Sequence, residues 1–200
     1  MARRTEGAAC ARRRAALLTV LLLGAGTAVH AQPRPERLAA CAACHGPGGQ
    51  SALPGTPSLA AQPKLFIENQ LVIIREGLRD VPAMKPLLAG MADEEIVALA
   101  TYYAAQPAKA LTPATQPDKA RAGAAIAQRL SCGSCHLPTY AGQQQVPRLA
   151  GQDEAYLLQA MKQLRDHPGP GRDTIMASTL RGLSDADLDS LAHYLAHSAP

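Results

Sequence analysis

The chain of 200 residues is long enough for one ordinary domain or for two very small ones. Hydrophobic residues make up 47% of it but aromatic residues only 3%, so its core must be filled by aliphatic side chains or by a group that is not protein. The formal net charge of +4 comes from five arginines and one glutamate within residues 1–31; the remaining fifteen basic and fifteen acidic residues exclude the basic surface of a nucleic-acid-binding domain.

Residues 1–31 have the pattern of a signal peptide. An arginine-rich start precedes the apolar stretch "AALLTVLLLGAG", which is too short to span a bilayer comfortably, and "AVHAQP" then offers small residues at Val29 and Ala31. We expect cleavage after Ala31 and export to the periplasm. A retained membrane anchor is the alternative interpretation of this segment.

The next feature is the pattern C-x-x-C-H, which occurs twice, as Cys41, Cys44 and His45 and as Cys132, Cys135 and His136. This pattern is typical of c-type haem attachment. On a helix, the two cysteines lie one turn apart on one side, where both can bond to the vinyl groups of one haem. The histidine that follows can bind the iron. The sequence therefore predicts two covalently attached haems.

Two other interpretations of the cysteines require different surroundings. A redox dithiol predicts one C-x-x-C within a βαβ unit, and no strand-rich pattern surrounds either pair. A zinc site needs four ligands held together, and about 90 residues separate the two motifs. Both interpretations stay open but are less favoured than haem.

The two motifs belong to an internal repeat. "PSLAAQ" and "LFIENQL" follow the first motif, "PRLAGQ" and "YLLQAMKQL" follow the second, and the offset varies only from 90 to 92 residues. The segment between the repeats is rich in proline and small residues, as in an extended linker. We predict a first domain over 32–106, a linker over 107–117 and a second domain over 118–200.

Each predicted domain has helical periodicity. Apolar residues recur at i, i+3, i+4 and i+7 near the end of each repeat, at Ile96, Leu99, Ala100 and Tyr103 and at Leu188, Leu191, Ala192 and Leu195. Middle helices are expected to begin near Pro63 and Asp153, and Ser184 with Asp187 forms a possible capping box for the last helix. No segment alternates as a strand does, so the predicted fold class is all-α.

Methionine is the candidate for the second axial position of each haem iron. Met84 and Met176 are equivalent by the 92-residue offset, and the prolines and glycines around them predict loops before each final helix. A side chain on such a loop can reach the haem face opposite the histidine. Met91 and Met161 lack this equivalence and are expected to pack in the core.

These features together resemble the di-haem class I cytochromes c of the c-four type, electron carriers made of two fused cytochrome c domains. The resemblance covers about residues 37–198 and rests on the two C-x-x-C-H motifs, on "PSLAAQ" and "PRLAGQ", and on a methionine seven residues before the leucine of "LSD". It implies axial pairs of His45 with Met84 and of His136 with Met176.

The resemblance also implies features that the spacing alone does not. The carbonyls of Pro57 and Pro147 would accept hydrogen bonds from the ligand histidines, which orients such rings, and the two domains would pack about a pseudo-twofold axis. One departure concerns the helix before each motif. The second domain has a full segment containing Gly123, whereas the first has only "QPRPERLAA", which predicts a short or absent helix.

The expected function is that of a periplasmic di-haem carrier without catalytic residues, passing single electrons from a respiratory donor to an acceptor such as a terminal oxidase. The alternative is the cytochrome subunit of a dehydrogenase complex, for example in flavin-linked sulfide oxidation. A di-haem peroxidase is a third possibility and would need an open iron site. We expect redox proteins as partners, no nucleic acid, and membrane association only through those partners.

Overall fold

The computed structural model describes residues 32–110, 112 and 114–198, so the predicted signal peptide lies outside the described residues. Within these ranges the regular structure is helical, apart from one isolated β-bridge between Gln143 and Val146. The predicted all-α class is thereby confirmed.

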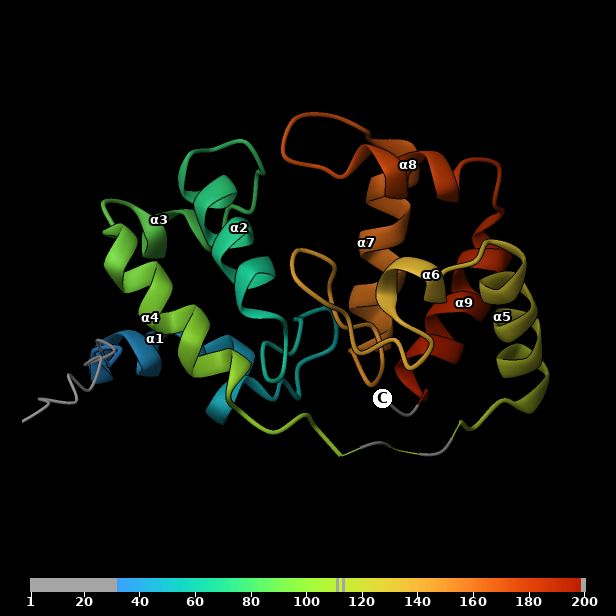
Figure 1. Ribbon diagram of the computed structural model, residues 1–200, viewed down its shortest axis with the longest axis horizontal. Helices are drawn as coiled ribbons and strands as arrows, with labels where there is room; N and C mark the ends of the chain where they lie inside the picture. The colour runs from blue at the N-terminus through green and yellow to red at the C-terminus, as the bar shows by residue number, and fades with distance from the viewer. Residues whose placement is uncertain (1–31, 111, 113, 199–200) are drawn as a thin grey trace, which may run out of the picture.

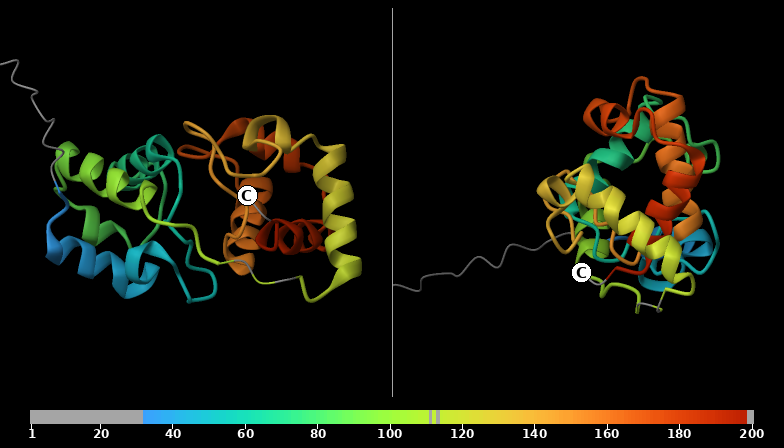
Figure 2. Two further views of the ribbon diagram at one scale, coloured as in Figure 1. Left: turned by 60° about the horizontal axis from the view of Figure 1, so that its bottom comes forward. Right: turned by 90° about the vertical axis from the view of Figure 1, so that its right-hand side faces the viewer.

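The helices form two groups that follow one another along the chain (Figure 1). The first group comprises α1 (Pro35–His45), the 3₁₀-helix η1 (Pro47–Gly49), α2 (Lys64–Arg75), α3 (Lys85–Leu88) and α4 (Asp93–Ala104). The second comprises α5 (Pro117–Arg129), α6 (Gly133–His136), α7 (Glu154–Asp166), α8 (Thr174–Leu180) and α9 (Asp185–Ala196). Residues 105–110 and 114–116, which lie between α4 and α5, are found along one side of the two groups (Figure 2).

Each group has its own hydrophobic core, and both cores are mainly aliphatic. The buried residues of the first are Ile67, Ile74, Leu88, Met91, Ile96, Leu99, Ala100 and Tyr103. Those of the second are Ile126, Ala127, Leu157, Met161, Leu180, Leu183, Leu188, Leu191, Ala192 and Leu195. These lists share no residue and include Met91 and Met161, which confirms the expected core positions of those two methionines.

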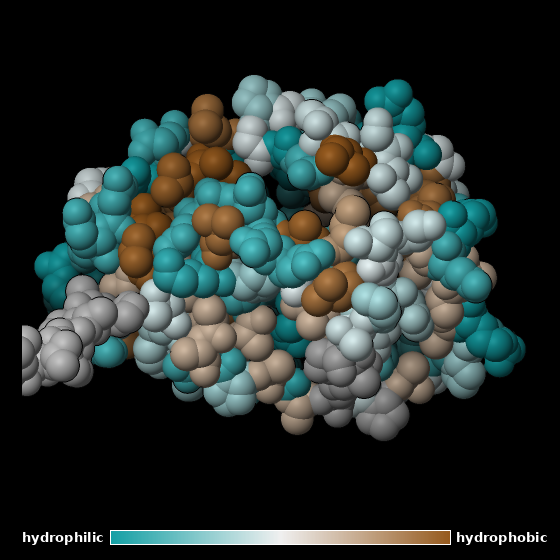
Figure 3. Space-filling view, viewed as in Figure 1, coloured by the Kyte–Doolittle hydropathy of each residue, from teal (hydrophilic) through white to brown (hydrophobic). Residues whose placement is uncertain are grey.

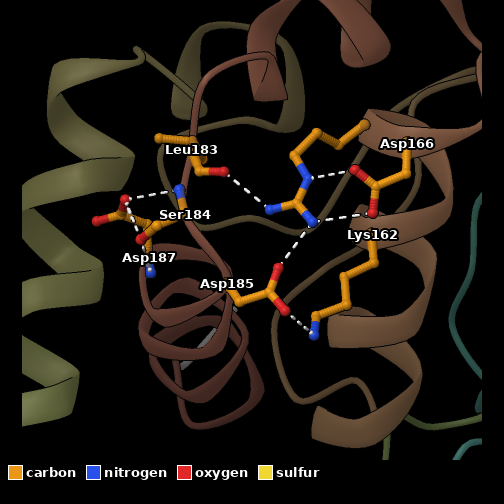
Figure 4. A network of polar contacts seen from close by, with 7 residues as sticks. Lys162, Asp166, Leu183, Ser184, Asp185 and Asp187 are labelled. Atoms are coloured by element: carbon orange, nitrogen blue, oxygen red, sulfur yellow. Dashed lines mark hydrogen bonds and ion pairs between the residues drawn. The ribbon is translucent and has the colours of Figure 1, made fainter.

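The helix starts follow local chemistry. The side chain of Asp153 accepts a hydrogen bond from the Tyr156 backbone N–H and caps α7. Ser184 and Asp187 form the predicted capping box at the start of α9, and Figure 4 shows their reciprocal bonds. In the first group α4 has no side-chain cap at Ala92, and Asp93 instead pairs with Arg75.

The helix before the motif is the main difference between the groups. The helix before the first motif is short, one of the two outcomes that the sequence predicted: only residues 35–40 of α1 precede Cys41, whereas all 13 residues of α5 precede Cys132. Proline is tolerated in a first turn, so α1 begins at Pro35 and continues through the cysteine motif, whereas α5 ends before it. Arg34 and Arg37 then join α1 to α4 through Glu95.

Gly123 allows α5 to cross α9 at close range. A Cβ atom on Gly123 would lie 2.1 Å from the Ser190 carbonyl oxygen and 2.6 Å from the Tyr194 Cβ. Because backbone and Cβ atoms cannot rotate away, the two helices would have to separate. The residue 91 positions earlier is Gln32, which precedes α1, so the first group has no equivalent crossing.

We therefore expect Gly123→Ala to destabilise the second group by about 1–3 kcal/mol, as overpacking does, despite the higher helix propensity of alanine. Thermal unfolding of the haem-loaded protein measures this. Gly169→Ala is the control, because no atom lies within 4 Å of its added Cβ. Equal midpoints for the two variants would contradict the close crossing.

Among the described residues, none of the helices is both long enough and apolar enough to cross a membrane. Apolar residues on the face shown in Figure 3 gather in separate patches among polar ones. Leu87 and Ile175 are exposed large hydrophobic residues, and Ile175 is 70% exposed. They lie close in sequence to Met84 and Met176 respectively, so apolar surface accompanies both methionine segments.

Candidate haem sites

The four cysteines lie on or beside helices. Cys41 and Cys44 are in the last turns of α1, while Cys132 is the N-cap residue of α6 and Cys135 lies within it. In each pair the first cysteine is partly buried and the second is exposed, and all four thiols are free. Burial raises the pKa of the Cys41 and Cys132 thiols. Each pair therefore places two free thiols one turn apart, as thioether attachment to one haem requires.

His45 and His136 are buried and held in the same way. The Nδ1 atom of His45 lies 2.8 Å from the Pro57 carbonyl oxygen, and Nδ1 of His136 lies 2.8 Å from that of Pro147. A carbonyl can only accept, so each Nδ1 carries the hydrogen and each Nε2 keeps its lone pair. Burial lowers the pKa of both imidazoles, against the opposing effect of the proline carbonyls. Both rings thus present a neutral nitrogen suited to iron.

The two methionines occupy different local structures. Met84 is the N-cap residue of the short helix α3, close to the predicted loop. The loop predicted for Met176 is wrong: Met176 lies in the first turn of α8, where its backbone N–H donates to Asp173 Oδ1 at 2.7 Å. The aspartate cap starts a helix that the surrounding glycines do not suggest. Both side chains pack against the core of their own group.

Equivalent arginines close the segments that carry the methionines. In the first group Arg75, at the end of α2, donates to the Met91 carbonyl at 2.7 Å and pairs with Asp93. In the second, Arg165 donates to the Leu183 carbonyl at 2.8 Å and pairs with Asp185 (Figure 4). Each arginine thereby ties the chain that follows the methionine to the helix that precedes it.

The two groups meet through a reciprocal set of hydrogen bonds. Gln152 receives a bond from the Ser58 N–H at 2.7 Å and donates to the Ser58 carbonyl at 2.9 Å. Gln62 receives a bond from the Arg148 N–H at 2.9 Å and donates to the Arg148 carbonyl at 2.9 Å. Ser58 and Arg148 are equivalent in the repeat, as are the two glutamines, so the contact has the symmetry of the sequence.

This interface lies next to the proline carbonyls that accept hydrogen bonds from the two histidines. Ser58 follows Pro57, and Arg148 follows Pro147, in the chain. In each domain, one short segment therefore makes both contacts. Its proline carbonyl binds the imidazole, and the residue after the proline bonds to the other domain. The repeated segments "PSLAAQ" and "PRLAGQ" can be recognised in the sequence. No local pattern in the sequence predicts that they bond to each other across the two domains.

Arg148 supplies a test of whether the site fits a haem. Its side chain is buried, with the residue 3% exposed, and its guanidinium donates to the carbonyls of Ala150 and Ala60. Nε has no hydrogen-bond partner, and no carboxylate pairs with this cation among the described residues. Buried charges normally have a partner. A haem carries two propionate carboxylates. An unpaired guanidinium on the residue after Pro147, whose carbonyl binds His136, is therefore suited to a haem.

The glutamine bonds give a prediction for the interface. Gln62→Ala leaves the buried N–H and C=O of Arg148 without partners, which costs about 1–3 kcal/mol for each group. We expect the Arg148 amide to exchange with deuterium faster in this variant, as measured by hydrogen exchange with mass spectrometry. Gln145→Ala is the control, since Gln145 also crosses between the groups, to Asn69, but at an exposed position. Unchanged protection in Gln62→Ala would argue against the reciprocal contact.

Known proteins resemble the chain in both halves. The family model described as "Cytochrome c" matches residues 120–199, and that described as "Cytochrome C oxidase, cbb3-type, subunit III" matches residues 30–102. Cytochrome c4 of Pseudomonas aeruginosa is 31% identical over 89% of this chain and 92% of its own length. The thiosulfate dehydrogenase electron acceptor of Thiomonas intermedia is 31% identical over 81% of this chain and 80% of its own.

A solved structure extends the similarity to the fold. Reduced recombinant cytochrome c4 from Pseudomonas stutzeri superposes with a TM-score of 0.76 at 28% identity, covering 82% of this chain and 95% of the other. That coverage includes both helical groups. The similarity therefore extends beyond a single domain to the paired arrangement.

Proposed function

Because the chain belongs to the cytochrome c4 family of di-haem electron carriers, we propose that it works in the periplasm, between a respiratory donor and a terminal oxidase. Its two cytochrome c domains with their C-x-x-C-H motifs carry two covalent c-type haems, and it is an electron-transfer protein that acts with redox protein partners. The family argues against the peroxidase considered from the sequence.

The proposed ligands are His45 with Met84 and His136 with Met176, with thioether bonds at Cys41, Cys44, Cys132 and Cys135. The observation that carries this assignment is the repeated 2.8 Å bond from each histidine Nδ1 to a proline carbonyl. It leaves the same nitrogen of both rings for iron, and such bonds raise the donor strength of the ring.

The protein's own residues then favour electron transfer over catalysis. The haem supplies an iron that takes up and releases one electron. A histidine and a methionine would bind the haem iron in each domain, and this pair of ligands favours a relatively high reduction potential. The proline carbonyls hold the rings, the arginines at the ends of α2 and α7 hold the methionine segments, and the aliphatic cores keep out water. Little has to move when the charge on the iron changes.

The exposed apolar residues support docking near the methionines. Leu87 and Ile175 are exposed beside the segments that carry Met84 and Met176. We propose that partners approach the domains at these positions, where exposed apolar side chains lie next to the proposed methionine ligands.

A dehydrogenase partner is the second candidate. The similarity to the thiosulfate dehydrogenase electron acceptor of Thiomonas favours a role in accepting electrons from sulfur-compound oxidation. The two candidates differ in the direction of electron flow at the partner. In the first the partner oxidises this protein, and in the second the partner reduces it.

Stopped-flow kinetics separates these candidates. In one experiment the ferrous protein is mixed with membrane vesicles that contain terminal oxidase and expose their periplasmic face. In the other, the ferric protein is mixed with thiosulfate dehydrogenase and thiosulfate. Rapid oxidation in the first mixture supports the oxidase assignment, and rapid reduction in the second supports the dehydrogenase. If neither reaction exceeds that of a mitochondrial-type cytochrome c control, the proposed partners are wrong.

A further inference from the structure

A second polar cluster lies in the second domain, apart from the proposed haem ligands. It comprises Glu154 at the start of α7 and His193 and His197 in the last turns of α9. One ligand atom from each residue lies within 4.8 Å of those from the other two. The Glu154 Oε2 atom is 3.0 Å from His193 Nδ1 and 3.5 Å from His197 Nε2.

The linker fixes the tautomer of His197. Nδ1 of His197 lies 2.7 Å from the Thr112 carbonyl oxygen, which can only accept, so Nδ1 carries a hydrogen. In the neutral ring Nε2 then has a lone pair, and this lone pair faces a carboxylate oxygen. Two acceptors at 3.5 Å repel each other unless a proton or a metal ion lies between them. The contact with a carbonyl is also the one that metal-binding histidines commonly make.

His193 brings a second imidazole to the same carboxylate oxygen. The residue is 1% exposed, and its Nδ1 side faces Glu154. Its other nitrogen, Nε2, is buried and has no hydrogen-bond partner among the described residues. Nδ1 is therefore the ring atom of His193 that this cluster can use. The rings of His193 and His197 lie 4.6 Å apart between centroids.

The surrounding charges leave room for a cation. Lys119 pairs with Glu154 through the other carboxylate oxygen, Oε1, at 3.3 Å, and with Asp189 at 2.7 Å. With neutral imidazoles, the two carboxylates and one ammonium give a net charge of −1. A divalent ion at Oε2 would bring the cluster to +1, while Lys119 remains satisfied by Asp189.

The first domain has no counterpart of this cluster. The residues at the equivalent positions are Lys64, Thr101 and Ala105, none of which offers an imidazole or a carboxylate. The cluster therefore does not follow from the duplicated cytochrome scaffold. It lies in the second domain, at the place where α7, α9 and the linker residue Thr112 meet.

We propose that Glu154, His193 and His197 form a binding site for a divalent transition-metal ion, of which zinc is the best match. Two nitrogens and one carboxylate oxygen are a ligand set that zinc takes, leaving a fourth position for water. Ligand atoms of a tetrahedral zinc site are about 3.3 Å apart, given bond lengths near 2.0–2.1 Å, and the observed separations of 3.0 and 3.5 Å bracket this value. The ion would tie the linker residue Thr112 to α7 and α9 through His197.

Isothermal titration of the untagged, leader-free holoprotein with zinc tests the site. We expect one zinc ion per chain. His197→Ala and Glu154→Gln should each weaken binding by about tenfold or more. His167→Ala is the matched control, because His167 caps the far end of α7 and is exposed. Zinc should also raise the unfolding midpoint of the wild-type protein and leave that of His197→Ala unchanged.

Haem absorbance shows that each variant is folded before it is titrated. If the wild-type protein binds no zinc, a proton rather than a metal ion lies between His197 and Glu154, and the proposal is wrong. Zinc binding that survives both His197→Ala and Glu154→Gln but is lost in His167→Ala would place the ion on the surface and would equally overturn it.

Discussion

Replacing Cys132 and Cys135 together by serine will yield an exported protein that carries one haem instead of two. Serine cannot form the thioether bonds, so the mass of the intact chain should fall by that of one haem relative to wild type. The second domain should also lose much of its helical structure. A core of this size is marginal without additional stabilisation, and this core is aliphatic and lacks large aromatic side chains.

The corresponding change at Cys41 and Cys44 should remove the other haem and leave the second domain folded. Ser134→Ala is the control, since Ser134 lies between the cysteines of the second motif and is exposed. It should retain both haems. Mass spectrometry and circular dichroism measure the two effects. A serine variant with two haems, or zinc found in place of haem, would contradict the assignment of the motifs.

Replacing Met84 or Met176 by alanine should have the largest effect on the redox chemistry. Each change removes the proposed methionine from one iron, so the methionine–iron charge-transfer band of that haem alone should disappear. Its potential should fall by tenths of a volt, within the range of about 0.8 V over which axial ligands set haem potentials. Absorption spectroscopy and a redox titration give both quantities.

Met91→Leu and Met161→Leu are matched controls, because these buried methionines lie in the cores and the exchange nearly conserves volume. Their spectra should keep both charge-transfer bands. His167 is the rival ligand in the second domain, since it precedes the segment that carries Met176. If His167→Ala changed the spectrum and Met176→Ala did not, His167 would be the ligand.

The sequence predicted the features that depend on local spacing or on repetition. Helical periodicity gave the all-α class, and the capping box at Ser184 needs only neighbouring residues to be recognised. The repeat identified Met84 and Met176 as equivalent, although their role as ligands stays a prediction. In each case the physical cause lies within one helix or one repeat unit.

The features that the sequence did not show depend on competition or on distant contacts. The glycines around Met176 favour a loop, but the Asp173 cap stabilises the first turn of α8. The sequence did not show that α1 would begin at Pro35, a first-turn position that tolerates proline, and continue through the cysteine motif. Glu154 and His193 are 39 residues apart in the chain, and His197 is farther still. No local sequence pattern predicts that these three residues lie together.

The reciprocal bonds of Gln62 and Gln152 have the form of an isologous interface, in which equivalent residues on two partners exchange the same contacts. The chain is therefore organised as a homodimer whose subunits have become one polypeptide. In a dimer of separate subunits this contact would depend on protein concentration. Here the linker makes the encounter intramolecular, at an effective concentration of about the millimolar order. The two halves can then stay paired at low protein concentration through these polar contacts.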